Sequence, residues 1–182
     1  MEILDSGNRR QFESGAVRDI VEGKGRCDLM PLKMISHILA VHSTKPQLQK
    51  QEPNRGNPAG EMMVSLILDD IDQFMHDADI NHLNRAVCTF IDDILCGDMW
   101  STLLRLSKHY EGGAMKYGER NWEKGIALHS YVDSGIRHLL KYSRGDNDEP
   151  HDIAFIWNML GAMWTVVNKP ECIDLPTEGS SR

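Results

Sequence analysis

Apolar residues recur at spacings of three and four along most of this chain, and this period constrains its fold more than any other feature. Two segments show the period most clearly. They carry Met63, Ile67, Ile71 and Phe74 within residues 61–77, and Leu83, Val87, Phe90, Ile91 and Ile94 within residues 80–97. Such spacing puts apolar side chains on one face of an α-helix. Since no stretch alternates apolar and polar residues over a useful strand length, the sequence predicts an all-α fold.

Further helices are predicted from similar patterns and from their end signals. Pro31 suits the first turn of a helix, while Gly97 and the pair Gly112 and Gly113 are expected to end helices. The segment GERNWEKG, residues 118–125, is predicted to be a loop. The predicted helices cover residues 32–42, 61–77, 80–97, 99–112, 126–143 and 149–167.

The whole chain, residues 1–182, is predicted to form a single domain. Residues 1–31 are expected to form a structured arm, with a disordered tail as the alternative. The arm's apolar anchors are Phe12, Val17, Ile20 and Leu29. Residues 43–60 carry three prolines, two glycines and almost no apolar residue, which is typical of a mobile loop. Residues 168–182 are expected to form a flexible tail.

Composition excludes several classes of protein. A net charge of -7 argues against non-specific nucleic-acid binding, which needs a basic surface. The four cysteines form no CxxC pair, so we expect reduced thiols, with Cys88 and Cys96 buried in helices, and no zinc site. The N-terminal sequence is too polar for a signal peptide, and no apolar run is long enough to cross a bilayer. The sequence thus predicts a cytoplasmic protein without membrane contact.

The segment from Glu111 to Asn158 holds the candidate chemistry. Charged, amide and histidine side chains are crowded there beside apolar helix faces. They are Glu111, Lys116, Asp133, Arg137, His138, Glu149, His151, Asp152 and Asn158. A buried charge is costly unless it is paired or bound to a metal. The pattern indicates a metal-dependent site for a phosphorylated ligand.

Glu149 and Asp152 form an ExxD motif at the start of an apolar helix. Residues three apart share a helix face, so both carboxylates can address one Mg²⁺ or Mn²⁺. The alternative is that they stabilise the helix N-terminus. An antiparallel hairpin through the SRGDN turn could bring Asp133, Arg137 and His138 against the same acids.

A basic loop precedes these helices. Lys116, Arg120 and Lys124 surround Asn121 and Trp122. Such a loop suits phosphate charge and stacking on a base or sugar. The alternative for Trp122 is a place in the core.

Two further patterns are weaker. Asp69, Asp70, Asp72, Asp92 and Asp93 could bind a metal, but without basic partners a solvated helix face explains them. The adjacent His151 and Asp152 are similar to the metal-binding HD dyad, which needs further histidines and a distant aspartate.

Four blocks give the chain a resemblance to a known family. They are FESGAVRDIVEGKGRCDLMP, EGGAMKYGERNWEKG, DSGIRHLLKY, and GDNDE followed by HDIAFIWN, whereas residues 32–110 are largely unmatched. The chain resembles the phage dATP/dGTP diphosphohydrolases, called MazZ-like, which are related to the all-α MazG/HisE nucleoside triphosphate pyrophosphatases. The resemblance implies a MazG-like helical bundle.

The same resemblance implies hydrolysis of dGTP to the monophosphate and pyrophosphate, with dATP left open as a second substrate. In a phage, such an enzyme would feed dGMP to 2-aminoadenine nucleotide synthesis, in the host cell cytoplasm. The implied cofactor is a divalent metal, Mg²⁺ with Mn²⁺ or Co²⁺ as alternatives. The implied assembly is a homo-oligomer, a dimer or a tetramer, without nucleic-acid polymer or membrane as a partner.

Site residues follow from the motifs and the resemblance together. The expected metal ligands are Glu111, Asp133, Glu149 and Asp152, and the expected catalytic residues are Glu149, Asp152 and Asp133. Substrate binding is expected from Lys24, Arg26, Lys116, Arg137, His138, Asn121, Trp122 and Asn158. Related sequences carry an acid before the histidine, as in DEDHLA, so Asp152 and His151 remain alternatives for the functional match. Two other functions stay open: an HD-type dNTP triphosphohydrolase and a non-enzymatic helical adaptor that binds through residues 61–96.

Overall fold

The computed structural model describes residues 9–19, 22–44, 58–95 and 98–175. Its α-helices are α1 (Leu32–Thr44), α2 (Pro58–Asp77), α3 (Ile80–Thr89), α4 (Met99–Tyr117), α5 (Leu128–Arg144) and α6 (His151–Asn168). Short turns are the 3-10 helices η1 (Cys27–Leu29), η3 (Asn121–Lys124) and η4 (Pro170–Cys172) and the π-helix η2 (Phe90–Ile94). The body is all-α, as the apolar period predicts.

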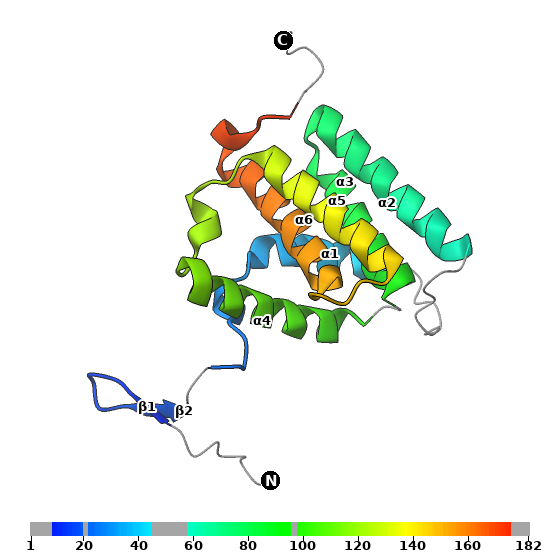
Figure 1. Cartoon of the computed structure of the whole chain (residues 1–182). Coiled ribbons are helices and arrows are strands. Elements are labelled where there is room, and N and C mark those ends of the chain that lie inside the picture. Colours follow the sequence, from blue (N-terminus) through cyan, green and yellow to red (C-terminus); the bar gives the residue numbers. More distant parts are fainter. Residues whose placement is uncertain (1–8, 20–21, 45–57, 96–97, 176–182) are drawn as a thin grey trace.

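Helix α6 forms the centre of the body (Figure 1). Residues 151–156 and 158–163 of this helix are all buried, because α6 contacts α1, α3, α4 and α5. A helix that is apolar on nearly every side is stable only when neighbours surround it. The polar side chains His151, Asp152 and Asn158 are therefore carried into the interior by the same helix.

Helices α5 and α6 form an antiparallel hairpin through the SRGDN turn, as expected. Gly145 ends α5 with φ of 93°, a left-handed conformation that favours glycine, and its N–H donates to the carbonyls of Lys141 and Tyr142. The hairpin places the C-terminal half of α5 beside the start of α6 (Figure 1). This arrangement brings residues near position 138 against residues near position 151.

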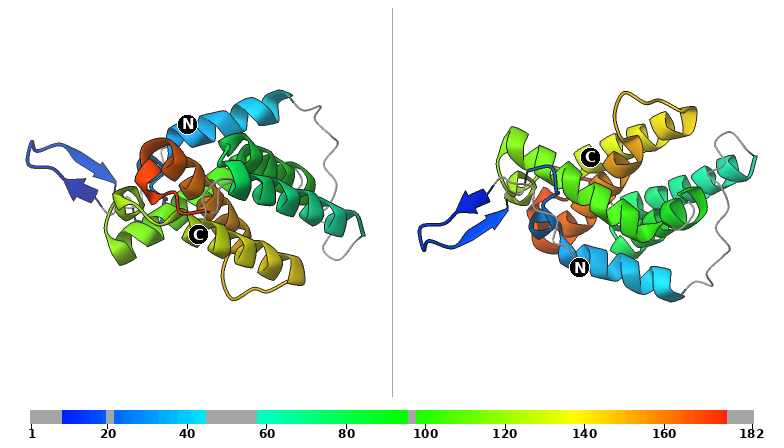
Figure 2. Two further views of the ribbon diagram at one scale, coloured as in Figure 1. Left: turned by 90° about the horizontal axis from the view of Figure 1, so that it is seen from above. Right: turned by 90° about the horizontal axis from the view of Figure 1, so that it is seen from below.

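Helices α2 and α3 pack together beside this hairpin (Figure 2). Asp79 caps α3 by accepting a hydrogen bond from the backbone N–H of Asn81. The helix predicted over residues 80–97 changes to a π-helix at Phe90, and the wider turn keeps Phe90 and Ile91 buried. The predicted end at Gly97 lies outside the described residues.

Helix α4 is longer than predicted. It does not end at Gly112 and Gly113 but continues to Tyr117, and Gly118 ends it with φ of 89°. Glycine inside a helix costs stability without removing a hydrogen bond. After the two glycines, Ala114 packs against the core, so burial favours another turn.

The described part of the arm contains a β-hairpin that the sequence pattern did not predict. Strand β1 (Arg9–Gln11) pairs antiparallel with β2 (Val17–Asp19), and the hairpin projects from the helical body (Figures 1 and 2). Of the expected anchors, Leu29 is buried, but Phe12 and Val17 are exposed. Ile20 lies outside the described residues. The described part of the arm contains this hairpin and η1, and it contacts the body through its last residues, while residues 1–8 and 20–21 lie outside the described residues.

The other boundaries also shift. Helix α1 runs to Thr44 and α2 begins at Pro58, so the predicted loop 43–60 is shorter at both ends. Its centre, residues 45–57, lies outside the described residues. After Asn168 the chain makes the turn η4, and Leu175 is buried, so residues 168–175 do not fray as expected, and residues 176–182 lie outside the described residues.

Two expectations from composition can be compared with the structure. Cys88 is buried as predicted, whereas Cys27 is exposed and Cys96 lies outside the described residues. Within the described parts of the chain, no helix has the length and apolar character needed to span a membrane.

Candidate metal centre

Three potential metal ligands meet where α5 packs against the start of α6. The Nδ1 atoms of His138 and His151 lie 2.9 Å apart. Oε1 of Glu149 lies 3.7 Å from Nδ1 of His138 and 3.5 Å from Nδ1 of His151. The side chain of His151 is 1% exposed, and that of Glu149 is 46% exposed. The cluster therefore has a buried floor and one side open to solvent.

Asp148 determines which nitrogen of His151 carries the proton. Its Oδ1 atom lies 2.7 Å from Nε2 of His151. Because a carboxylate only accepts, Nε2 donates, and Nδ1 of neutral His151 keeps its lone pair for the ligand cluster. A histidine whose second nitrogen donates to a carboxylate is the usual arrangement of a metal-binding histidine.

Burial favours the neutral form of the histidines near the cluster. It lowers the pKa of His138, and the opposing effect of Glu149 is smaller. Burial also lowers the pKa of His109 on α4, again against the effect of Glu149. Neutral imidazole is the form that binds a metal. The environment of His138 therefore suits a ligand better than a cation.

The spacing of the three ligand atoms fits a single ion. Atoms that share one ion at about 2.1 Å lie about 3.0–3.5 Å from one another. The distances of 2.9, 3.5 and 3.7 Å are close to this range. Two imidazoles and one carboxylate are a ligand set typical of transition metals, whereas Mg²⁺ prefers oxygen ligands. His138, Glu149 and His151 could hold a divalent metal.

A second group of potential ligands consists of Asp146, Asp148 and His151. Its acids are already engaged with cations, because Asp146 pairs with Arg144 and Asp148 pairs with Lys141. These partners hold the pKa of both carboxyls below the usual range. The first group is therefore the better metal centre, and Asp148 is better placed to orient His151.

Asp152 points to an arginine that the sequence analysis did not select. Arg105 on α4 donates from Nη1 to Oδ2 of Asp152 at 2.6 Å and from Nη2 to Oδ1 at 2.9 Å. The backbone N–H of Ile153 also donates to Oδ1. Arg105 lies outside the four sequence blocks that carry the resemblance, so only the helical packing of α4 on α6 could have revealed it.

The other expected metal ligands belong to neither cluster. Glu111 accepts hydrogen bonds from the backbone N–H groups of Gly23 and Gly25, at 2.8 and 2.9 Å, and so holds the arm on α4. Asp133 is exposed and pairs with Arg137 one turn along α5. Among the described residues, the groups of potential ligand atoms that lie within 4.8 Å of one another do not include Glu111, Asp133 or Asp152. A site built from all four acids stays a prediction.

Hydrogen bonds and ring contacts occupy several of the expected substrate-binding residues. Arg26 pairs with Asp28 and Glu119 at 2.7 Å each. Lys116 lies over the ring of Tyr117, 4.9 Å from its centre, and its side chain is exposed. Lys24 is exposed at the arm's docking point. The basic groups thus lie around the C-terminal end of α4, and phosphate binding by them stays a prediction.

Trp122 is a core residue, which is the alternative that the sequence left open. It is 7% exposed and packs edge-on against Tyr110 and Trp164. Asn121 accepts a hydrogen bond from Lys124 within the turn η3. Asn158 is buried and donates to the carbonyl of Ala154 in its own helix. These contacts favour structural roles for Trp122 and Asn158.

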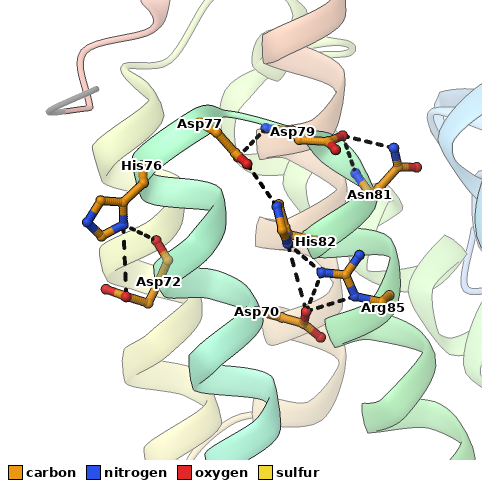
Figure 3. A network of polar contacts seen from close by, with 8 residues as sticks. All are labelled: Asp70, Asp72, His76, Asp77, Asp79, Asn81, His82 and Arg85. Atoms are coloured by element: carbon orange, nitrogen blue, oxygen red, sulfur yellow. Dashed lines mark hydrogen bonds and ion pairs between the residues drawn. The ribbon is translucent and has the colours of Figure 1, made fainter. Parts of the chain in front are cut away.

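The second acidic set is not a bare solvated face. Figure 3 shows Asp70 paired with Arg85, with His82 between that pair and Asp77. Asp92 lies 2.5 Å from Nδ1 of His42 on α1. The expectation that these acids lack basic partners is therefore wrong for Asp70 and Asp92. The contacts of these two acids join α2 to α3 and α1 to η2, which explains them through helix packing.

The match to known proteins covers this same region. A family model described as dATP/dGTP diphosphohydrolase, N-terminal, matches residues 78–174, which is more than half of the 182-residue chain. The matched part includes α4, α5, α6 and the whole His138–Glu149–His151 cluster. Comparison with curated proteins finds no significant match, and comparison with solved structures finds none either. The resemblance carried by GGAMKYGERNW and RHLLKY is confirmed, and the chain belongs to the dATP/dGTP diphosphohydrolase family.

Proposed function

We propose that this protein hydrolyses dGTP and dATP to the monophosphate and pyrophosphate, with a divalent metal held by His138, Glu149 and His151. The observation that carries the proposal is the meeting of these three ligand atoms within the segment that matches the family. A triphosphate has a high negative charge, so an acidic protein needs a cation to bind it. A cluster with one exposed side gives such a substrate access.

Hydrolysis would follow the usual course of phosphoryl transfer. The oxygen of a water molecule would attack the α-phosphorus, the bond to the bridging oxygen would break, pyrophosphate would leave, and the water would lose a proton to the solvent. His138, Glu149 and His151 would hold the divalent ion, which would supply charge neutralisation at the phosphates and a lower pKa for bound water. The protein's task is chiefly positioning. Asp148 fixes the ring orientation of His151, and burial favours the neutral form of His138. The two histidine ligands are therefore in place before the substrate binds.

The ligand chemistry favours Mn²⁺ or Co²⁺ over Mg²⁺ as the activating ion, because two of three ligands are imidazoles. The biological role we propose is supply of dGMP for 2-aminoadenine nucleotide synthesis in a phage. That role is supported by the family resemblance alone. The homo-oligomer implied by the same resemblance stays a prediction, which light scattering on the purified protein tests.

Product analysis tests the proposed function. Metal-stripped protein is incubated with each dNTP and Mg²⁺, Mn²⁺ or Co²⁺, and the phosphate products are separated. We expect pyrophosphate from the purine nucleotides, fastest with Mn²⁺ or Co²⁺. Tripolyphosphate would instead support the HD-type triphosphohydrolase, and no hydrolysis with any ion would support the adaptor.

A single substitution tests the site itself. Glu149→Gln keeps the size of the side chain but removes the charge that binds metal, so turnover should be lost while the circular dichroism spectrum and melting temperature stay unchanged. Glu171→Gln is the control, because Glu171 is also an exposed glutamate, at 64% against 46% for Glu149, and lies on η4 with Lys169 as its ion-pair partner. Normal activity of Glu149→Gln would remove Glu149 from the site.

A further inference from the structure

Arg105 is anchored by one largely buried carboxylate, while about half of its own side chain is exposed. Its two Nη atoms bind the two oxygens of Asp152 at 2.6 and 2.9 Å. The Asp152 side chain is 11% exposed, whereas that of Arg105 is 47% exposed. Asp152 is further fixed by the backbone N–H of Ile153 at 2.9 Å. The carboxylate therefore holds the guanidinium in one orientation.

The anchor leaves donors for a second anion. A guanidinium has five N–H groups, and the pair with Asp152 uses one from each Nη atom. The remaining Nε–H and the outer N–H of Nη2 point in parallel from one edge of the planar group. In the described part of the chain, no protein acceptor takes these donors. Two parallel N–H groups match two oxygens of a phosphate.

The position of Arg105 connects this edge to the metal centre. Arg105 and His109 lie one turn apart on α4 and so share a face of the helix. His109 lies close enough to Glu149 to be affected by its charge, and its ring packs on Trp157 of α6. Asp152 directly follows His151 in α6. Arg105 is therefore anchored at the first turn of α6, the turn that also carries the ligand His151.

We propose that Arg105 binds the polyphosphate chain of the nucleotide, and that Asp152 acts as its positioning residue. This inference rests on the proposed function and names the phosphate-binding group for that site. The cationic edge of Arg105 binds phosphate oxygens beyond those next to the metal. Asp152 acts through Arg105, because its own oxygens already accept three hydrogen bonds.

A structural staple between α4 and α6 is the competing explanation, and the chain offers a matched control for it. Arg85 on α3 forms an ion pair with Asp70 on α2 and so joins two helices, and Figure 3 shows this pair. The two arginines are equally exposed, at 48% and 47%, and their carboxylates are similarly buried, at 16% and 11%. A staple alone predicts equal effects for both substitutions.

The test compares Arg105→Gln with Arg85→Gln in the full chain. Calorimetry measures binding of inorganic tripolyphosphate, with and without Mn²⁺, and steady-state kinetics measures KM and kcat for dGTP. Loss of a charge-assisted phosphate contact should weaken tripolyphosphate binding by about 10- to 100-fold in Arg105→Gln. Arg85→Gln should bind as the wild type does. Equal affinities of Arg105→Gln and the wild type would overturn the proposal, as would absence of tripolyphosphate binding by the wild type in both conditions.

Two further variants separate positioning from folding. Arg105→Lys retains the charge and an ion pair with Asp152 of α6 but lacks the parallel donors, so it should fold normally and recover only part of the affinity. Asp152→Asn should raise KM for dGTP more than it lowers kcat, because it loosens the orientation of Arg105. Full recovery of affinity and KM by Arg105→Lys would reject the two-donor contact.

The outcomes also separate this inference from the proposed function. A wild-type protein that binds tripolyphosphate through Arg105 but hydrolyses no dNTP would reject the hydrolase and keep the binding site. A wild-type protein that hydrolyses dGTP, with Arg105→Gln unchanged in KM and affinity, would keep the hydrolase and reject the role of Arg105.

Discussion

The Nδ1 atoms of His138 and His151 lie 2.9 Å apart, facing each other across the α5–α6 hairpin. Since Nε2 of His151 donates to Asp148, the Nδ1 atom of His151 accepts, and Nδ1 of His138 donates to it when no metal is present. The two rings also lie close, with centres 5.2 Å apart. A metal ion would replace the shared proton, so the same geometry serves both states.

Asp148 should control metal affinity without binding the metal. Asp148→Asn weakens the hydrogen bond that orients His151, and loss of such an outer partner typically lowers metal affinity by about 10- to 100-fold. We expect this change in Mn²⁺ titrations of metal-stripped protein. Asp146→Asn is the control, because Asp146 bonds Arg144 instead of His151. A larger loss in Asp146→Asn would place the metal in the second cluster.

Stability should decrease as the pH falls through the range where His138 binds a proton. The pKa of His138 in the folded protein is below its ordinary value of 6.5. Between these two pKa values the unfolded chain binds more protons than the folded one. The free energy of unfolding therefore decreases as the pH decreases, and this loss of stability is complete below the pKa of the folded protein. Urea unfolding in EDTA should show this slope below about pH 6.5.

The variant His138→Gln supplies the comparison for that slope. It cannot bind a proton at this position, so its free energy of unfolding should vary less with pH than that of the wild type. His109 contributes in the same direction, since burial also lowers its pKa. A slope identical in His138→Gln and the wild type would contradict the assignment to His138.

Replacing either of two helical glycines with alanine should change the stability of the protein, in opposite directions. A Cβ atom at Gly112 of α4 would meet no atom within 4 Å, whereas one at Gly161 of α6 would lie 2.4 Å from the ring of Tyr131. Gly112→Ala should therefore stabilise the protein by about 1 kcal/mol through helix propensity. Gly161→Ala should destabilise it by about 1–3 kcal/mol through overpacking. Urea unfolding measures both, and the same sign for both would contradict the packing of α5 on α6.

The sequence predicted the helical body because its apolar period records which faces are buried. It failed where tertiary contacts override local signals, as in α4, which continues through Gly112 and Gly113 because Ala114 packs on the core. For the site, the motif indicated Glu149 and a histidine alternative, His151. Arg105 could not be predicted, since its partner Asp152 lies on another helix and only packing brings them together.

The arm should be released from α4 by changes at its docking point. Gly25 has φ of 88°, and a Cβ atom there would lie 2.1 Å from Oγ of Ser107 and 3.1 Å from the backbone N of Lys108. Gly25→Ala is therefore both strained and sterically blocked. Glu111→Gln should act in the same direction, because it weakens two charge-assisted hydrogen bonds to the arm.

Limited trypsin digestion measures this release. Cleavage after Lys24 and Arg26 should become faster in Gly25→Ala and in Glu111→Gln, while the melting temperature changes little, because Leu29, the arm residue that is buried in the core, is not changed. Gly23→Asn is the control, since a Cβ atom at Gly23 meets nothing within 4 Å and asparagine tolerates its φ of 77°. If Gly23→Asn were cleaved as fast as Gly25→Ala, the close contact between Gly25 and Ser107 would not be what holds the arm.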